Sequence, residues 1–325
     1  MRSCPNSRAL LAGAAFFVVE SFFGIAIAGP GLDTQGRSEA SYAPITNQPS
    51  RDQLFEAHVI PDGIAESNTE QVTSLGLPEH FEFPRSVDYD VIEQRPRVGA
   101  IFGIDISHHN GRAFPFDKLK DQEARFIYIK ATQGTTFADP TFKYNWPNAS
   151  AAGIRRGAYH FLSSSTPGKE QADAFVDYLN LHGGLKSDDL PPAIDLEWDV
   201  SSTNPDNWNG RGEHYIIKSL LDCLQQIEAR TGRRPIIYTA KSWWGISTLP
   251  LSDVAKIQGY SIWIADYNRN RKLSERPQLL PHASNVIWQF TAAAALTENS
   301  NKPVDASIFY GDADAFRRTF GVPLN

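Results

Sequence analysis

Short apolar runs with the character of β-strands recur along the chain from about residue 100 onward. Runs of this length, bounded by turn-forming residues, are typical of buried strands. They predict strands at residues 100–106, 126–130, 157–162, 192–197, 235–239, 261–265, 285–290 and 304–309.

Longer segments between several of these runs repeat their apolar residues at helical spacing. The segment 168–183 gathers apolar side chains on one face and closes at Gly183; these side chains are Ala172, Phe175, Val176 and Leu179. The segment 213–230 is followed by Gly232, and glycine is a common stop at the carboxyl end of a helix. Both segments are predicted to be helices.

The order of these elements predicts the fold class. Strands that alternate with helices favour a mostly parallel sheet, and about eight strands over ~225 residues suggest a barrel of the (β/α)₈ kind. The connections after Ala265 and Phe290 look too irregular for full helices. We therefore expect an α/β protein with a modified, incomplete (β/α) barrel of about eight strands and fewer helices, similar to a TIM barrel.

The first residues have a different pattern, that of a secretory signal peptide. Arg2 and Arg8 precede an apolar stretch that contains Glu20 and ends in an A-x-A sequence at Ala28. The prediction is a signal peptide at 1–28 that is cleaved after Ala28, which makes the protein secreted or periplasmic. An uncleaved anchor is the alternative, although the acidic Glu20 is costly in a permanent membrane span.

Residues 29–97 carry scattered proline and many Ser, Thr, Asn and Gln residues with little periodicity. Such a composition is typical of a linker-like, partly disordered segment. The catalytic domain is expected at 98–325. The role of the segment before it is not readable from the sequence.

Composition and charge narrow the set of partners. The 325 residues are 41% hydrophobic and 21% charged, as in an ordinary globular protein, and the net charge is −6. Loss of the signal peptide would leave −7. Such a surface does not suit nucleic acid or an anionic membrane, so neither partner is predicted, and a monomer is expected. Cys223, the one cysteine left after cleavage, lies on the apolar face of the second helix and is predicted to be a buried structural thiol.

Candidate chemistry is concentrated in the stretch LPPAIDLEWD, which places Asp195 and Glu197 at the end of an apolar run. Alternate residues of a strand point to the same face, about 6–7 Å apart along it. Two carboxyl groups near this separation can flank a glycosidic bond. Trp198 lies beside them, and aromatic rings are common platforms for sugars.

Other strand ends add acids and aromatic rings. In (β/α) barrels the chemistry sits where the strands end. The ends predicted here contribute the acids Asp105 and Asp305 and the aromatic residues Tyr159, Phe161, Tyr238, Trp263, Tyr267 and Trp288. Each aromatic ring could instead pack in the barrel. Acids and rings that converge on one mouth predict a groove that cleaves sugars.

The order of these motifs resembles glycoside hydrolase family 25, the N-acetylmuramidase lysozymes. The likeness covers about residues 100–312 and rests on GIDISHHNG, YIKATQG, DPTF, GAYHFL, AIDLE, PIIYT, WIADY, WQF and VDASIF. The resemblance implies a modified β/α barrel and cleavage of the β-1,4 bond between N-acetylmuramic acid and N-acetylglucosamine in the glycan strands of peptidoglycan. It implies no cofactor and no metal.

The resemblance also implies roles for the four acids. Glu197 is expected to be the general acid, and neighbouring carboxylates and partial burial should raise its pKa toward the protonated state that it needs. Asp195 acts either as the nucleophile or as the group that orients the substrate's 2-acetamido group. Asp105 and Asp305 hold sugar hydroxyls or position the acetamido group. Retention, inversion and a substrate-assisted route all stay open. Phe290 replaces the tyrosine that is commoner at the end of the WQF motif.

Other enzyme classes fit less well. The DxxDxDxE pattern of chitinase-like barrels fails, because Ala193 and Leu190 occupy two of its acidic positions. His108 and His109 are adjacent and show no metal-binding spacing, and the G-x-S-x-G motif of serine hydrolases is missing from the sequence. Two alternatives remain: a peptidoglycan-binding protein without turnover, and an endoglycosidase that acts on another amino-sugar polymer.

Overall fold

The computed structural model describes residues 89–90, 95–96, 100–121, 124–246, 256–267, 284–294 and 304–324. The predicted signal peptide and most of the predicted linker lie outside these residues, so both stay predictions. Two short strands of the linker, β1 (Tyr89–Asp90) and β2 (Arg95–Pro96), pair with each other in antiparallel fashion. No helix within the described ranges is both long and apolar enough to cross a membrane.

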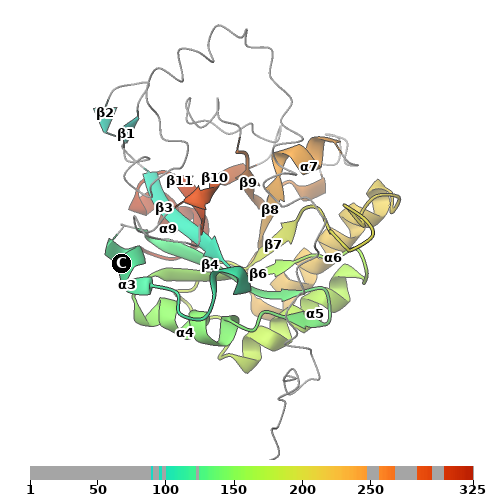
Figure 1. Ribbon diagram of the computed structural model, residues 1–325, viewed down its shortest axis with the longest axis horizontal. Helices are drawn as coiled ribbons and strands as arrows, with labels where there is room; N and C mark the ends of the chain where they lie inside the picture. Colours follow the sequence, from blue (N-terminus) through green and yellow to red (C-terminus); the bar gives the residue numbers. More distant parts are fainter. Residues whose placement is uncertain are drawn as a thin grey trace, which may run out of the picture.

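Eight strands of the described chain close into a barrel (Figure 1), which confirms the predicted fold class. The closure comes from the pairing of the first of these strands with the second. In chain order they are β3 (Ala100–Ile106), β4 (Phe126–Gln133), β6 (Arg155–Phe161), β7 (Ala193–Leu196), β8 (Ile236–Ala240), β9 (Ser261–Ala265), β10 (Ser284–Ala294) and β11 (Val304–Tyr310). A short strand, β5 (Phe137–Ala138), extends the sheet beside β4.

Strand β11 departs from the mostly parallel sheet that the sequence predicts. It pairs antiparallel with both of its neighbours, β10 and β3, whereas the other neighbouring barrel strands are parallel. The beginning of β11 therefore lies at the end of the barrel where the other strands finish. This reversal places Asp305 near the start of its strand and still opposite Asp105.

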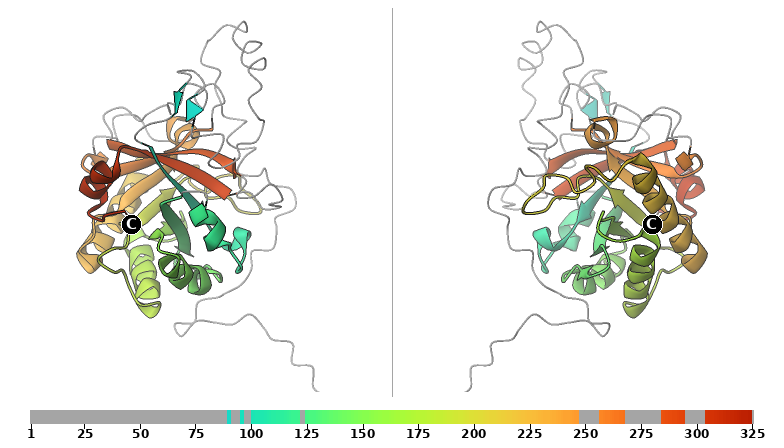
Figure 2. Two further views of the ribbon diagram at one scale, coloured as in Figure 1. Left: turned by 90° about the vertical axis from the view of Figure 1, so that its left-hand side faces the viewer. Right: turned by 90° about the vertical axis from the view of Figure 1, so that its right-hand side faces the viewer.

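The long helices gather on one side of the barrel, opposite β10 and β11 (Figures 1 and 2). They are α4 (Phe142–Ala151), α5 (Gly168–Leu181) and α6 (Glu213–Thr231). The last two were predicted. The shorter helices are α3 (Phe116–Asp121), α7 (Lys241–Ile246), α9 (Ala313–Phe320) and the 3₁₀ turn η1 (His108–Asn110). Helices α5 and α6 pack closely because Gly168 has no side chain: a Cβ there would lie 1.8 Å from the carbonyl oxygen of Ser219.

Aromatic side chains fill the end of the barrel away from the ends of the parallel strands. Phe126, at the start of β4, lies against Gly103 and contacts Phe316 of α9 at a ring separation of 5.8 Å. Phe309 and Phe320 complete this cluster, and their rings lie 5.4 Å apart. Because this end is packed, the opposite end, here called the mouth, is the one left for chemistry.

Candidate active site

The four predicted acids lie at the mouth on three stretches of backbone. Asp105 is near the end of β3 and is in register with Asp305 of β11, so their Cα atoms are about 4.5–5.5 Å apart. Asp195 belongs to β7, and Glu197 follows that strand directly. Asp105, Asp195 and Glu197 are almost completely buried, with 5–6% of their surfaces exposed. Buried acids on strand ends are held more rigidly than acids on loops.

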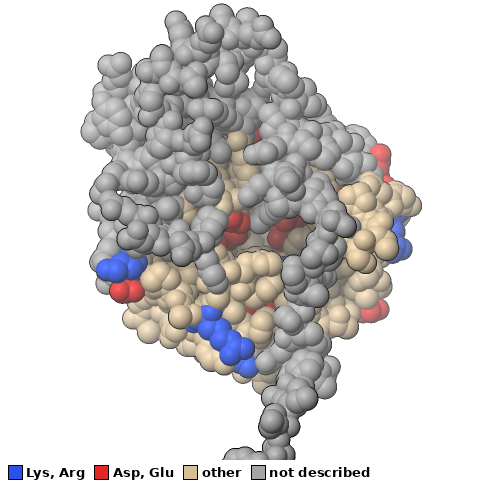
Figure 3. Space-filling view, viewed as in Figure 1, with Lys and Arg blue, Asp and Glu red and all other residues tan. Residues whose placement is uncertain are grey.

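Two of these acids share a small pocket with three of the predicted aromatic residues. This mouth pocket is lined by Asp105, Tyr159, Asp195, Tyr238 and Trp263, one residue from each of five strands. Figure 3 shows acidic residues near the middle of the face that is seen in Figure 1. The structure thus brings together five residues that the sequence singled out. Glu197 is not among the residues that line this pocket; it is buried two residues beyond Asp195, in the bend that follows β7.

Gln289, to which the sequence analysis gave no role, connects three of the predicted residues. Its Nε2 donates to Oδ2 of Asp105 at 2.6 Å. Its Oε1 accepts from the hydroxyl groups of Tyr238, at 2.9 Å, and of Tyr267. The side chain is fully buried. Gln289 therefore fixes the orientation of Asp105 and ties Tyr267 to the mouth pocket. The one signal in the sequence is a polar residue on the inward face of an apolar strand.

Two predicted aromatic residues lie elsewhere. Trp288 is not among the residues that line the mouth pocket: its indole nitrogen donates to the carbonyl oxygen of Asp266 at 3.0 Å, and its ring stacks on Tyr310 at 6.4 Å. Phe161, at the end of β6, lies with its ring centre 4.8 Å from Nζ of Lys130. That lysine also donates to Oε1 of Gln133 at 2.8 Å. Phe161 thus adjoins a buried cation at the rim of the barrel.

The histidines near the mouth serve local structure. Nδ1 of His108 lies 3.0 Å from Oδ2 of Asp139. Burial alone would raise the pKa of Asp139, but hydrogen bonds from His108 and Thr141 and the charge of His108 outweigh burial, and the pKa lies below its usual value. His160 is enclosed between Thr132 and Gln171. Among the described side chains, no group of three or more His, Cys, Asp or Glu residues is placed to hold a metal ion.

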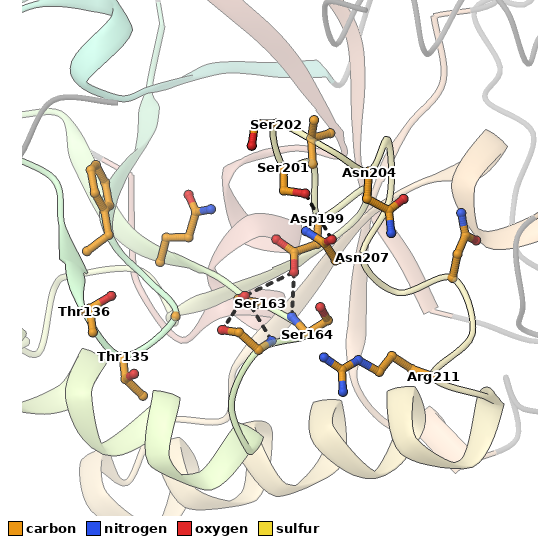
Figure 4. Close-up of a pocket in the computed structure, with 16 residues that line it drawn as sticks. Thr135, Thr136, Ser163, Ser164, Asp199, Ser201, Ser202, Asn204, Asn207 and Arg211 are labelled. Atoms are coloured by element: carbon orange, nitrogen blue, oxygen red, sulfur yellow. Dashed lines mark hydrogen bonds between the residues drawn. The ribbon is translucent and has the colours of Figure 1, made fainter. Parts of the chain in front are cut away.

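The structure has a second and larger cavity, of about 940 Å³ (Figure 4). We call it the polar pocket; residues of the segments 133–137, 163–165 and 199–211 line it. Asp199 is its one carboxylate. Oδ2 of Asp199 accepts from Oγ of Ser163 at 3.1 Å and from the backbone N–H of Ser164 at 2.8 Å.

Asp206 shapes the longest of the three segments. Its Oδ1 accepts from the backbone N–H groups of Asp199, at 3.1 Å, and Trp208, at 3.0 Å. Its Oδ2 accepts from the indole nitrogen of Trp243 at 2.8 Å. Burial raises the pKa of Asp206 above its usual value, although these hydrogen bonds oppose the shift. One buried carboxylate therefore fastens the loop to helix α7.

Comparison with known proteins points to one family. The sequence profile of glycosyl hydrolases family 25 matches residues 104–298. Lysozyme M1 of Streptomyces globisporus is 32% identical over 227 residues, which cover 66% of this chain and 70% of that protein. The N,O-diacetylmuramidase of Arthroderma benhamiae is 35% identical over 151 residues, which cover 46% of this chain and 61% of that one.

Solved structures agree with this result. The bacterial lysozyme from Streptomyces coelicolor matches with a TM-score of 0.57 and 30% identity, covering 67% of this chain and 96% of its own. A family 25 glycosyl hydrolase from Bacillus anthracis matches with a TM-score of 0.57 and 26% identity, covering 74% of this chain and 96% of its own.

Proposed function

The chain belongs to glycosyl hydrolases family 25, and we propose that it is a lysozyme that cleaves the β-1,4 bond between N-acetylmuramic acid and N-acetylglucosamine in peptidoglycan. The observation that carries this proposal is the mouth pocket. It joins Asp105 and Asp195 to three aromatic rings, and Glu197, which is equally buried, stands two residues beyond Asp195 in the chain. Paired carboxyl groups and aromatic walls are what the hydrolysis of a glycosidic bond requires.

Glu197 is proposed as the general acid. It must carry a proton in order to donate it to the bridging oxygen while the bond from that oxygen to the anomeric carbon breaks. The residue is buried, with 5% of its surface exposed, and the equally buried Asp195 is two residues away in the chain. Both conditions favour the protonated form over the charged form. The same group then accepts a proton from the water that completes hydrolysis.

Asp195 is proposed as the second carboxylate. In one route its oxygen attacks the anomeric carbon and forms a covalent glycosyl intermediate. In the other route the carbonyl oxygen of the substrate's own acetamido group attacks, and Asp195 orients that group and stabilises its positive charge. Asp105, held by Gln289, and Asp305 contact the sugar in both routes. Water finally attacks the anomeric carbon and releases a reducing-end N-acetylmuramic acid.

Secretion belongs to the same proposal, because peptidoglycan lies outside the cytoplasmic membrane. The support is the sequence pattern of residues 1–28. Amino-terminal sequencing of the protein recovered from the culture medium or periplasm should begin at Gly29. Recovery of an intact amino terminus in the membrane fraction would favour the uncleaved anchor instead.

Mass spectrometry of soluble products from purified peptidoglycan tests the activity. Fragments with reducing-end N-acetylmuramic acid are expected. Reducing-end N-acetylglucosamine would show that the other bond is cleaved. If the protein binds cell walls without releasing products, it is the binding protein that the sequence left open.

A further inference from the structure

The polar pocket is separate from the mouth pocket, although one stretch of chain reaches both. Asp195 lines the mouth pocket and Asp199 lines the polar pocket, and the two cavities share no lining residue. Four residues of extended chain span at most about 14 Å, so the Cα atoms of these two aspartates are no farther apart than that. A ligand that is bound at the mouth can therefore extend into the polar pocket.

The lining of the polar pocket suits a neutral, hydrogen-bonding ligand along most of its length. Hydroxyl groups come from residues such as Ser165 and Ser202, and amide groups come from Asn204 and Asn209. The carboxylate of Asp199 is already engaged by Ser163 and Ser164. The pocket thus offers both donors and acceptors, as the amide groups of a peptide backbone require.

Arg211 adds a positive charge at one end of the pocket. Its side chain is exposed, and Figure 4 shows it extending toward Ser164. Within the part of the chain that the structure describes, no carboxylate forms an ion pair with it. In a protein with a net charge of −6, this guanidinium is suited to bind a carboxylate of the ligand.

We propose that the polar pocket binds the peptide stem of peptidoglycan, with a stem carboxylate on Arg211. This inference rests on the proposed function. The stem is joined to N-acetylmuramic acid by an amide bond, and it carries free carboxylates that the sugar backbone lacks at that point. Three or four peptide residues, at about 3.3–3.6 Å each, span the distance between the two pockets. A further sugar is less suited to this lining, because Phe137 is its one aromatic residue.

Direct binding tests the proposal without any need for catalysis. The probe is a synthetic stem pentapeptide, and its affinity is measured by calorimetry for the wild-type protein and for Arg211→Gln, Arg211→Lys and Arg318→Gln. Arg318 is the matched control, since it is an exposed arginine on α9. Arg211→Gln should weaken binding about fivefold, the scale of a partly exposed ion pair, whereas Arg211→Lys should restore part of the loss. Arg318→Gln should bind as the wild type does.

A variant that changes no charge tests whether the stem binds in the polar pocket. Ser202 is exposed and lines the pocket, so Ser202→Trp should obstruct the stem without removing an ionic contact. The proposal is overturned if the wild-type protein does not bind the pentapeptide. It is also overturned if Arg211→Gln and Arg318→Gln bind it equally well.

Kinetics separates this inference from the proposed function. The ratio of kcat/KM on soluble stem-bearing strands to kcat/KM on the same strands stripped by an amidase measures the preference for stems. This preference should fall about fivefold in Arg211→Gln and stay at the wild-type value in Arg318→Gln. An unchanged preference in Arg211→Gln, as a sugar subsite would give, contradicts the inference. Binding of the pentapeptide without hydrolysis of either substrate would contradict the proposed function alone.

Discussion

The two pockets beside strand β7 are built differently. Strand ends supply the acids of the mouth pocket, and the barrel fixes their positions. Loops supply the polar pocket, and its single carboxylate, Asp199, has its charge satisfied by Ser163 and Ser164. Asp199 and Glu197 are equally buried, at 5% exposure, so burial alone does not single out the proposed general acid. Under the proposed function, the chemistry would depend on the strands and the recognition of the stem on the loops.

Glu197→Gln should produce the largest change. The amide keeps the size of the side chain but has no proton to give to the leaving oxygen, so kcat/KM on peptidoglycan strands should fall at least about a hundredfold. The thermal midpoint of unfolding should stay near that of the wild type, and circular dichroism should confirm the fold. Activity close to that of the wild type would remove Glu197 from the chemistry.

Asp195→Asn should follow, with a loss of at least about tenfold in kcat and little change in glycan affinity. The reason is that an amide can still hydrogen-bond to the sugar but cannot attack the anomeric carbon or stabilise positive charge. Steady-state kinetics and a binding assay with the intact glycan separate the two effects. If the variant no longer binds glycan, Asp195 is a recognition residue.

Asp206→Asn acts on the polar pocket through the loop 199–211. Both oxygens of Asp206 accept hydrogen bonds, so whichever atom becomes an NH₂ group faces another donor. Stability should fall by about 1–3 kcal/mol in urea unfolding. The stem preference should fall more than the activity on stripped strands. A wild-type unfolding midpoint would show that these hydrogen bonds do not hold the loop.

The pH dependence of stability gives a further test of Asp206. Burial raises its pKa, so just above the usual pKa of about 4 the folded protein keeps a proton that the unfolded chain has lost. This contribution to the free energy of unfolding is present at low pH and disappears as the pH rises through the raised pKa. Asp206→Asn should lack it. The free energies of unfolding of the wild type and of Asp206→Asn, measured across this pH range, should therefore approach each other as the pH rises.

Trp288→Phe should have the smallest effect. Trp288 packs on Tyr310 and Asp266 and does not line the mouth pocket, so kcat/KM should stay within about threefold of the wild-type value. Stability should fall by about 1 kcal/mol, the cost of one buried hydrogen bond. A large loss of kcat with unchanged stability would place this tryptophan in the active site.

Much of the barrel could be predicted because its strands are short apolar runs with clear ends. Helix α4 could not, since Pro147 and a mixed pattern of polar and apolar residues conceal it. The reversal of β11 was also missed, because the pattern of a single strand carries no information about its direction. Asp305 reached the expected place only because its strand is reversed.

The candidate site was predicted less completely. Acids at strand ends are visible in a sequence, but the hydrogen bonds of Gln289 depend on three strands meeting in space. The polar pocket left no signal, since its serine, threonine and asparagine residues resemble those of ordinary loops. Asp199 stands in the same stretch as Glu197, and only the structure shows that it lines the polar pocket.

The most direct measurement compares Glu197→Gln with Asp199→Asn on the same soluble glycan strands, with the release of reducing-end N-acetylmuramic acid as the readout. The two carboxylates are two residues apart and equally buried, but Asp199 lines the polar pocket and Glu197 does not. We expect a loss of at least about a hundredfold for Glu197→Gln and of less than about tenfold for Asp199→Asn. Equal losses, or a greater loss for Asp199→Asn, would contradict the assignment of the chemistry to the mouth of the barrel.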